Sequence, residues 1–88
     1  MNNHNEVNLS SNFATNDFLL ATTLASLGFR LNFIDKANPK KVVFYFPQDQ
    51  ELNAALEGYW RDKLSVEPKR FGSKQRELKA RIHFEKWS

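Results

Sequence analysis

The stretch that most constrains the fold is residues 41–47, which read Lys-Val-Val-Phe-Tyr-Phe-Pro. This is the densest run of β-branched and aromatic residues in the chain, and such residues favour a strand. Pro47 ends the predicted strand because proline has no N–H to donate to a sheet. Apolar side chains on both of its faces predict a central strand that is covered on both sides, or on one side by a partner chain.

A second strand is predicted over residues 29–35. Apolar and polar residues alternate there from Phe29 to Phe33, with Arg30 on the polar face. The Asn-Pro pair within residues 36–40 favours a turn. Because this connection is short, we expect the two strands to form an antiparallel hairpin.

A first helix is predicted before the hairpin, over residues 16–27. Thr15 is a candidate N-cap, and Leu20 and Leu24 begin an apolar stripe at helical spacing. Gly28 follows at once and can adopt the left-handed conformation that ends a helix.

Two further helices are predicted after the hairpin. Asp49 is a candidate N-cap for a helix that ends near Trp60, and Pro68 is well placed as the first residue of a helix that reaches about residue 84. Between them, Leu64–Val66 is a candidate for a short third strand, since a two-stranded hairpin alone is marginal.

These elements predict an α+β fold: helix, β-hairpin, helix, short strand and helix, with helices covering an antiparallel sheet. Residues 1–14 are rich in Asn and Ser and are expected to form a flexible tail. Residues 15–88 are expected to form a single domain, as the length of 88 residues favours.

Charge is unevenly distributed along the chain. Residues 61–88 hold nine of the 13 Lys and Arg and four of the ten Asp and Glu, for a net charge of +5, whereas the first 60 residues carry −2. Such asymmetry favours an anionic partner, such as DNA or RNA.

The predicted last helix carries much of this basic charge on the two flanks of its apolar stripe. Such rows can follow the phosphates of a nucleic acid, or they can be long side chains that lie along the edge of a buried stripe. One flank holds Arg70, Lys74 and Arg81, and the other holds Arg76, Lys79 and Lys86. The remaining candidates for nucleic-acid binding are Lys69, Arg61 and Lys63.

The sequence contains no catalytic motif, and we expect that the protein is not an enzyme. It has no cysteine, and its two histidines, His4 and His83, lie in no recognisable motif. Its acidic residues are scattered, so we expect no metal site and no cofactor. We find no signal peptide and no apolar run of about 20 residues, and therefore expect a cytoplasmic protein without a membrane partner.

The aromatic residues leave a second function open. Val43 and Tyr45, on the second face of the hairpin, are candidates for a homodimer contact. Phe84 and Trp87 fall off the apolar stripe, so they can stack on bases, dock a partner or fold back onto the domain.

Seven short stretches form a pattern across residues 15–82: Thr15–Ala21, Leu27–Phe29, Val42–Phe46, Tyr59-Trp60, Val66, Phe71 and Leu78–Ile82. This pattern resembles a family of short bacterial and phage proteins that is known only as a domain of unknown function. The resemblance implies a small cytoplasmic protein, often from a mobile element. It implies no activity, cofactor or catalytic residue.

The sequence therefore favours a small module that binds the phosphate backbone of DNA or RNA through its basic last helix. The alternative is a protein–protein adaptor or homodimerising structural module of a phage or other mobile element. The two hypotheses differ in the surface they use: the last helix in the first, and the hairpin in the second.

Overall fold

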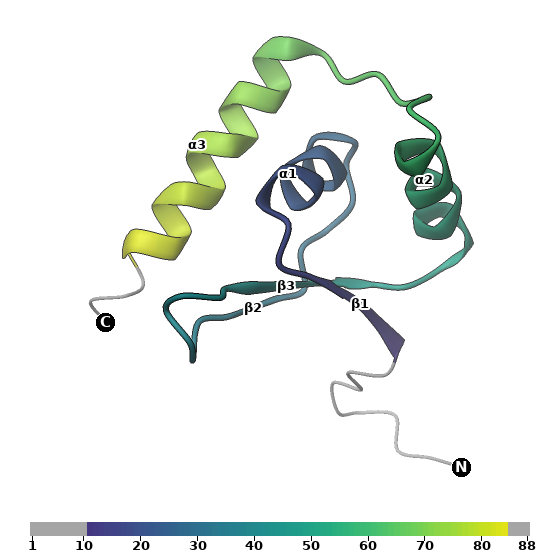
Figure 1. Ribbon diagram of the computed structural model, residues 1–88. Coiled ribbons are helices and arrows are strands. Elements are labelled where there is room, and N and C mark those ends of the chain that lie inside the picture. The colour runs from purple at the N-terminus through teal and green to yellow at the C-terminus, as the bar shows by residue number, and fades with distance from the viewer. Residues whose placement is uncertain (1–10, 85–88) are drawn as a thin grey trace.

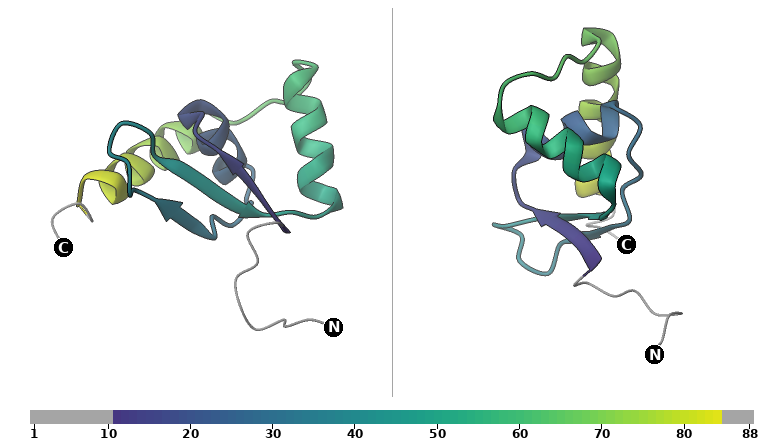
Figure 2. Two further views of the ribbon diagram at one scale, coloured as in Figure 1. Left: turned by 60° about the horizontal axis from the view of Figure 1, so that its bottom comes forward. Right: turned by 90° about the vertical axis from the view of Figure 1, so that its right-hand side faces the viewer.

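The computed structural model describes residues 11–84 (Figure 1). The elements are β1 (Asn12–Thr15), α1 (Phe18–Ser26), β2 (Phe33–Asp35), β3 (Val43–Pro47), α2 (Gln50–Trp60) and α3 (Pro68–Phe84). The strands form one antiparallel sheet in the order β1-β3-β2. All three helices lie on the same side of this sheet (Figures 1 and 2), which confirms the predicted α+β class.

Strand β3 is the centre of the sheet, as its composition predicts. Its Phe44 and Phe46 are buried beneath the helices. Phe46 pairs with Phe13 of β1, and Phe44 pairs with Ile34 of β2, so both neighbouring strands add apolar side chains to the same face. This face of the sheet forms the floor of the core.

The third strand is β1, and the prediction of a strand at Leu64–Val66 is wrong. A strand needs a partner, and both sides of β3 are already occupied by β1 and β2. Leu64 instead packs against α2, where its side chain lies 3.1 Å from the position that a Cβ on Gly58 would take. The flexible tail predicted over residues 1–14 extends too far along the chain, because residues 12–14 belong to strand β1. Residues 1–10 lie outside the described part of the chain.

The hairpin is present, but β2 is shorter than the predicted strand 29–35. The backbone N–H of Phe29 donates to the carbonyl of Leu24 at 3.1 Å, so the chain is still bonded to the end of α1 at this point. The N–H of Asn32 is the first to reach β3, where it donates to the Tyr45 carbonyl at 2.8 Å. The turn before β3 is confirmed by the bond from the Lys41 N–H to the Asn38 carbonyl at 2.9 Å.

Helix α1 begins two residues later than predicted, with Asp17 and not Thr15 as its N-cap. The Asp17 carboxylate accepts the Leu20 N–H at 3.2 Å, whereas the Thr15 hydroxyl accepts the N–H of Asp17 itself at 3.0 Å. Gly28 has the left-handed conformation expected of it, with φ +100°.

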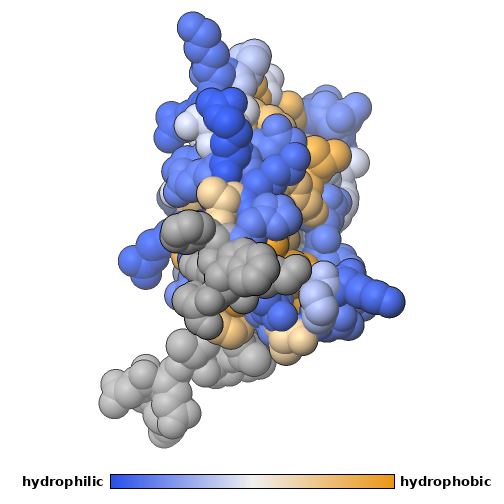
Figure 3. Space-filling view, turned by 90° about the vertical axis from the view of Figure 1, so that its left-hand side faces the viewer, coloured by the Kyte–Doolittle hydropathy of each residue, from blue (hydrophilic) through white to orange (hydrophobic). Residues whose placement is uncertain are grey.

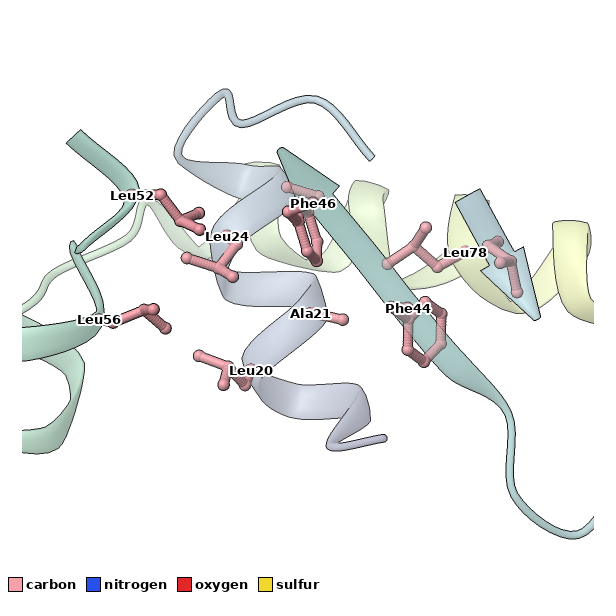
Figure 4. Packing of buried hydrophobic residues seen from close by; sticks show 10 residues of the cluster. Leu20, Ala21, Leu24, Phe44, Phe46, Leu52, Leu56 and Leu78 are labelled. Atoms are coloured by element: carbon pink, nitrogen blue, oxygen red, sulfur yellow. The ribbon is translucent and has the colours of Figure 1, made fainter. Parts of the chain in front are cut away.

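The middle of the molecule is α1, which is buried on every side from Leu20 onward, whereas Leu19 in its first turn is 55% exposed. All seven residues from Leu20 to Ser26 are buried, not only the stripe that spacing predicts, and Leu27 is exposed. Figure 4 shows the reason: Leu20, Ala21 and Leu24 lie among side chains of β3, α2 and α3. The buried residues include three polar ones, Thr22, Thr23 and Ser26.

Helices α2 and α3 flank α1 (Figure 1). Asp49 caps α2 as predicted, because its carboxylate accepts the Leu52 N–H at 2.8 Å. Pro68 opens α3, and the Glu67 carboxylate just before it accepts the Arg70 N–H at 2.9 Å. Among residues 11–84, no helix is both long and apolar enough to span a bilayer.

Candidate functional site

The strongest candidate site is a groove between α3 and the connection from α1 to β2. It is an open cavity of about 350 Å³, lined by four basic residues: Arg30, Arg70, Lys74 and Arg81. Its apolar lining comes from Ala25, Phe29, Leu31 and Leu78. We call it the basic groove, and we define it by its four cationic residues.

Three of these residues lie on one flank of α3. At 100° per residue, Arg70, Lys74 and Arg81 follow one edge of the stripe that turns Leu78 toward α1. Leu78 is buried, and Lys74 and Arg81 are half-buried beside it, which orients this flank toward the α1–β2 connection. Figure 3 views the face that carries α3, where hydrophilic residues predominate.

The fourth residue, Arg30, is brought to the groove by the way α1 ends. The N–H of Gly28 donates to the Ala25 carbonyl at 3.0 Å and that of Phe29 to the Leu24 carbonyl, which together form a Schellman motif. This motif turns the chain back toward α3, so that Arg30 comes to line the groove.

The groove has a strong excess of positive charge. Among the described residues that line it, Glu77 is the one carboxylate, against the four cations. The Lys74 Nζ lies 3.3 Å from the Glu77 carboxylate, but the two side chains are 36% and 55% exposed. An exposed ion pair of this kind is weak, at about 0–1 kcal/mol, so an anion can compete for Lys74.

The structure separates the other predicted site residues from this groove. Lys69, Arg76 and Lys79 are exposed on the remaining surface of α3. Arg61 lies at the end of α2 and pairs with Glu57 at 3.6 Å, and Lys63 is exposed just beyond it. Lys86, Trp87 and the Phe84 side chain lie outside the described part of the structure, as does His4.

Sequence reasoning missed Arg30. Alternation placed it on the polar face of a strand from 29 to 35, but residues 29–32 form a connection and not a strand. Its position beside α3 depends on how α1 packs against α3. The residues around Arg30 in the sequence do not indicate this packing.

A second cavity lies beside α2. It has a volume of about 390 Å³ and is lined by Thr23, Tyr59, Asp62, Leu64, Val66 and Phe71. Burial raises the pKa of the Tyr59 hydroxyl above its usual 10.0, and the negative charge of Asp17 raises that pKa further. None of the described residues that line this cavity is cationic, so they do not favour an anion.

A smaller cavity, of about 110 Å³, lies where the hairpin turn meets the end of α3. Lys36 and His83 are its polar lining residues, beside Pro39, Val42 and Ile82. Within residues 11–84, no three His, Asp or Glu side chains come close enough to hold a metal ion.

Comparison with known proteins shows the family. A family model described as Domain of unknown function (DUF5659) matches residues 10–84. The chain belongs to this family. The match begins earlier than the pattern over residues 15–82 and includes β1, so the sheet edge is part of the DUF5659 domain. No curated protein and no solved structure matches the chain.

Proposed function

We propose that this DUF5659 domain binds the phosphate backbone of a nucleic acid along the basic groove. The observation that supports the proposal is the convergence of Arg30, from the α1–β2 connection, with three cations of α3. Two separate segments of the chain thus supply positive charge to one cavity. If the basic residues of α3 were only solvated side chains on the surface of one helix, there would be no reason for a cation from another segment to lie beside them.

The length of the groove suits a polymer of phosphates. With a rise of about 1.5 Å per residue, Arg70 and Arg81 are roughly 16 Å apart along α3. A nucleic-acid duplex presents a phosphate about every 3.4 Å along each strand, so the row can contact more than one. Because phosphate contacts carry no sequence information, we expect affinity with little sequence preference.

The test compares two triple variants of the same helix by fluorescence anisotropy with labelled single- and double-stranded DNA and RNA. The groove variant is Arg70→Ala, Lys74→Ala and Arg81→Ala. The control variant is Lys69→Ala, Arg76→Ala and Lys79→Ala, which removes the same charge from the other exposed surface of α3. Alanine is the best helix former, so both variants are expected to keep α3.

We expect the groove variant to bind at least about tenfold more weakly than wild type, and the control variant only about two- to threefold more weakly, because it changes the net charge alone. Circular dichroism checks that both variants are folded. Equal losses in the two variants would mean that net charge and not the groove drives binding. No binding by the wild type at low salt would remove the proposal.

A further inference from the structure

The face of the sheet that points away from the helices is a second surface of distinct chemistry. The strand register places Ala14, Tyr45 and Phe33 in one row across the three strands, and Asp35 beside Val43 in the next row. Their neighbours Phe44 and Ile34 point into the core, so these five side chains point the other way. We call these five residues the outer sheet face.

This face is largely apolar and is not covered by the helices. All three helices lie on the opposite side of the sheet in each view of the molecule (Figures 1 and 2). The Phe33 side chain is 45% exposed, and its ring packs against that of Tyr45 with centroids 5.4 Å apart. Within β1, β2 and β3, Asp35 is the one charged residue.

We propose that a second copy of this chain packs against the outer sheet face, so that two copies associate about a two-fold axis. The distribution of charge favours a second copy of the chain as the partner. Each copy carries a net charge of +3, so two copies repel unless they meet where basic residues are absent. The three strands contain no Lys or Arg, and so their outer face meets this condition.

The charges at the border of the face are self-complementary as well. Val42 packs against the core, which leaves the exposed Lys41 on the same side as Val43. In a two-fold arrangement each contact occurs twice. Lys41 of one copy can then meet Asp35 of the other twice, both times at the hairpin-turn end of the face, where the two residues lie.

The size of the face sets the strength of the association. Strand spacing and rise give it dimensions of roughly 15 by 17 Å, or about 250 Å², which is well below the ~800 Å² per partner of a standard interface. We therefore expect weak, reversible association, with a Kd in the range of about 10–500 µM. The basic groove lies on the helical side of the sheet, so both copies keep it accessible.

The experiment is sedimentation equilibrium of the full chain from about 10 µM to about 1 mM, at two salt concentrations. The expected result is a monomer–dimer equilibrium that salt weakens little, because the face is largely apolar and exposed ion pairs contribute little. Nucleic-acid binding in the groove weakens with salt. The two proposals therefore fail independently. A wild-type chain that stays monomeric to 1 mM overturns this one.

Two matched variants locate the interface. Phe33→Glu places a carboxylate on the outer sheet face. Trp60→Glu is the control: it also replaces an exposed aromatic side chain by a carboxylate, but at the end of α2, where Trp60 is 64% exposed. We expect Phe33→Glu to weaken association at least tenfold and Trp60→Glu to leave it unchanged. Equal weakening, or a larger effect of Trp60→Glu, overturns the proposal.

A measurement on the wild type decides the matter even if Phe33→Glu does not fold. In ¹H–¹⁵N spectra recorded over the same concentration range, the amide signals of Ala14, Phe33 and Tyr45 are expected to shift most. Shifts confined to the helices instead place the contact elsewhere and overturn the proposal.

Discussion

Two residues hold the same position at the ends of two helices and differ in how well they suit it. Gly28 follows the C-cap of α1 with φ +100°, and Asp62 follows the C-cap of α2 with φ +62°. At Asp62 the bonds are again those of a Schellman motif: its N–H donates to the Tyr59 carbonyl at 3.0 Å, and the Lys63 N–H to the Gly58 carbonyl at 2.7 Å. Glycine has no Cβ to oppose this conformation, whereas aspartate does.

We expect Asp62→Gly to stabilise the domain by about 0.5–1 kcal/mol, because it relieves the left-handed backbone at a helix end. In a chain of this size such a gain raises Tm by roughly 2–8 °C, which differential scanning calorimetry measures.

Gly28→Ala is the matched change in the opposite direction. No atom lies within 4 Å of a Cβ added at Gly28, so its cost of about 1 kcal/mol comes from the backbone conformation alone. A lower Tm for Asp62→Gly than for wild type would show that its carboxylate contributes more than the backbone strain costs.

Among the elements, β1 was the strand that the sequence did not predict, and yet it contributes a side chain to the core. Strand β1 spans four residues, and Phe13 is the side chain that it packs against the core. Strand β2 spans three, and its Phe33 lies on the outer sheet face. The two phenylalanines are thus on edge strands of one sheet but on opposite faces of it.

We expect Phe13→Ala to lower the free energy of unfolding by about 2–3 kcal/mol, because it removes a ring from the core. Phe33→Ala removes a ring that is 45% exposed, and we expect a loss below about 1 kcal/mol. Urea denaturation measures both. Equal losses would contradict the role of β1 as part of the core.

Helix α1 accommodates polar residues in its buried surface without leaving them unsatisfied. The hydroxyls of Thr22, Thr23 and Ser26 donate to the carbonyls of Phe18, Leu19 and Thr22, at 2.8, 2.8 and 2.7 Å. Each bond spans one helical turn, which is a usual arrangement for Ser and Thr within a helix. These side chains therefore contribute mainly their methyl and methylene groups to the packing around α1.

At the scale of the whole molecule, the basic groove and the outer sheet face lie on opposite sides of the sheet. The groove joins segments that are 40 residues apart in the chain, from Arg30 to Arg70. Arg30 is the one of the four groove cations that does not lie on α3, so its contribution tests whether the groove, and not the basic helix alone, binds nucleic acid.

We expect Arg30→Ala to reduce the salt dependence of duplex DNA binding, lowering the slope of log K against log salt by about 0.9 if the side chain contacts one phosphate. Anisotropy titrations at several salt concentrations measure this slope. Arg61→Ala, at a residue that does not line the groove, is the control with an equal charge change. A slope that changes equally in both variants would argue against the groove.

Much of the fold follows from the sequence because its signals are local. The positions of β3 and of the three helices depend on side-chain periodicity and on caps such as Asp49 and Gly28, which act within one turn. The family was also recognisable, since the pattern over residues 15–82 consists mainly of these core and cap positions. The basic residues of α3 could likewise be assigned to two flanks from 100° per residue alone.

The remaining features depend on contacts between residues that are distant in the chain, so local patterns could not predict them. Residues 12–15 are too few for a clear alternation, and they form a strand because one side of β3 is available to pair with them. Leu64–Val66 has suitable residues but no strand to pair with, so it stays a connection. Arg30 lines the groove because α1 and α3 pack together, and that contact joins residues which the sequence keeps far apart.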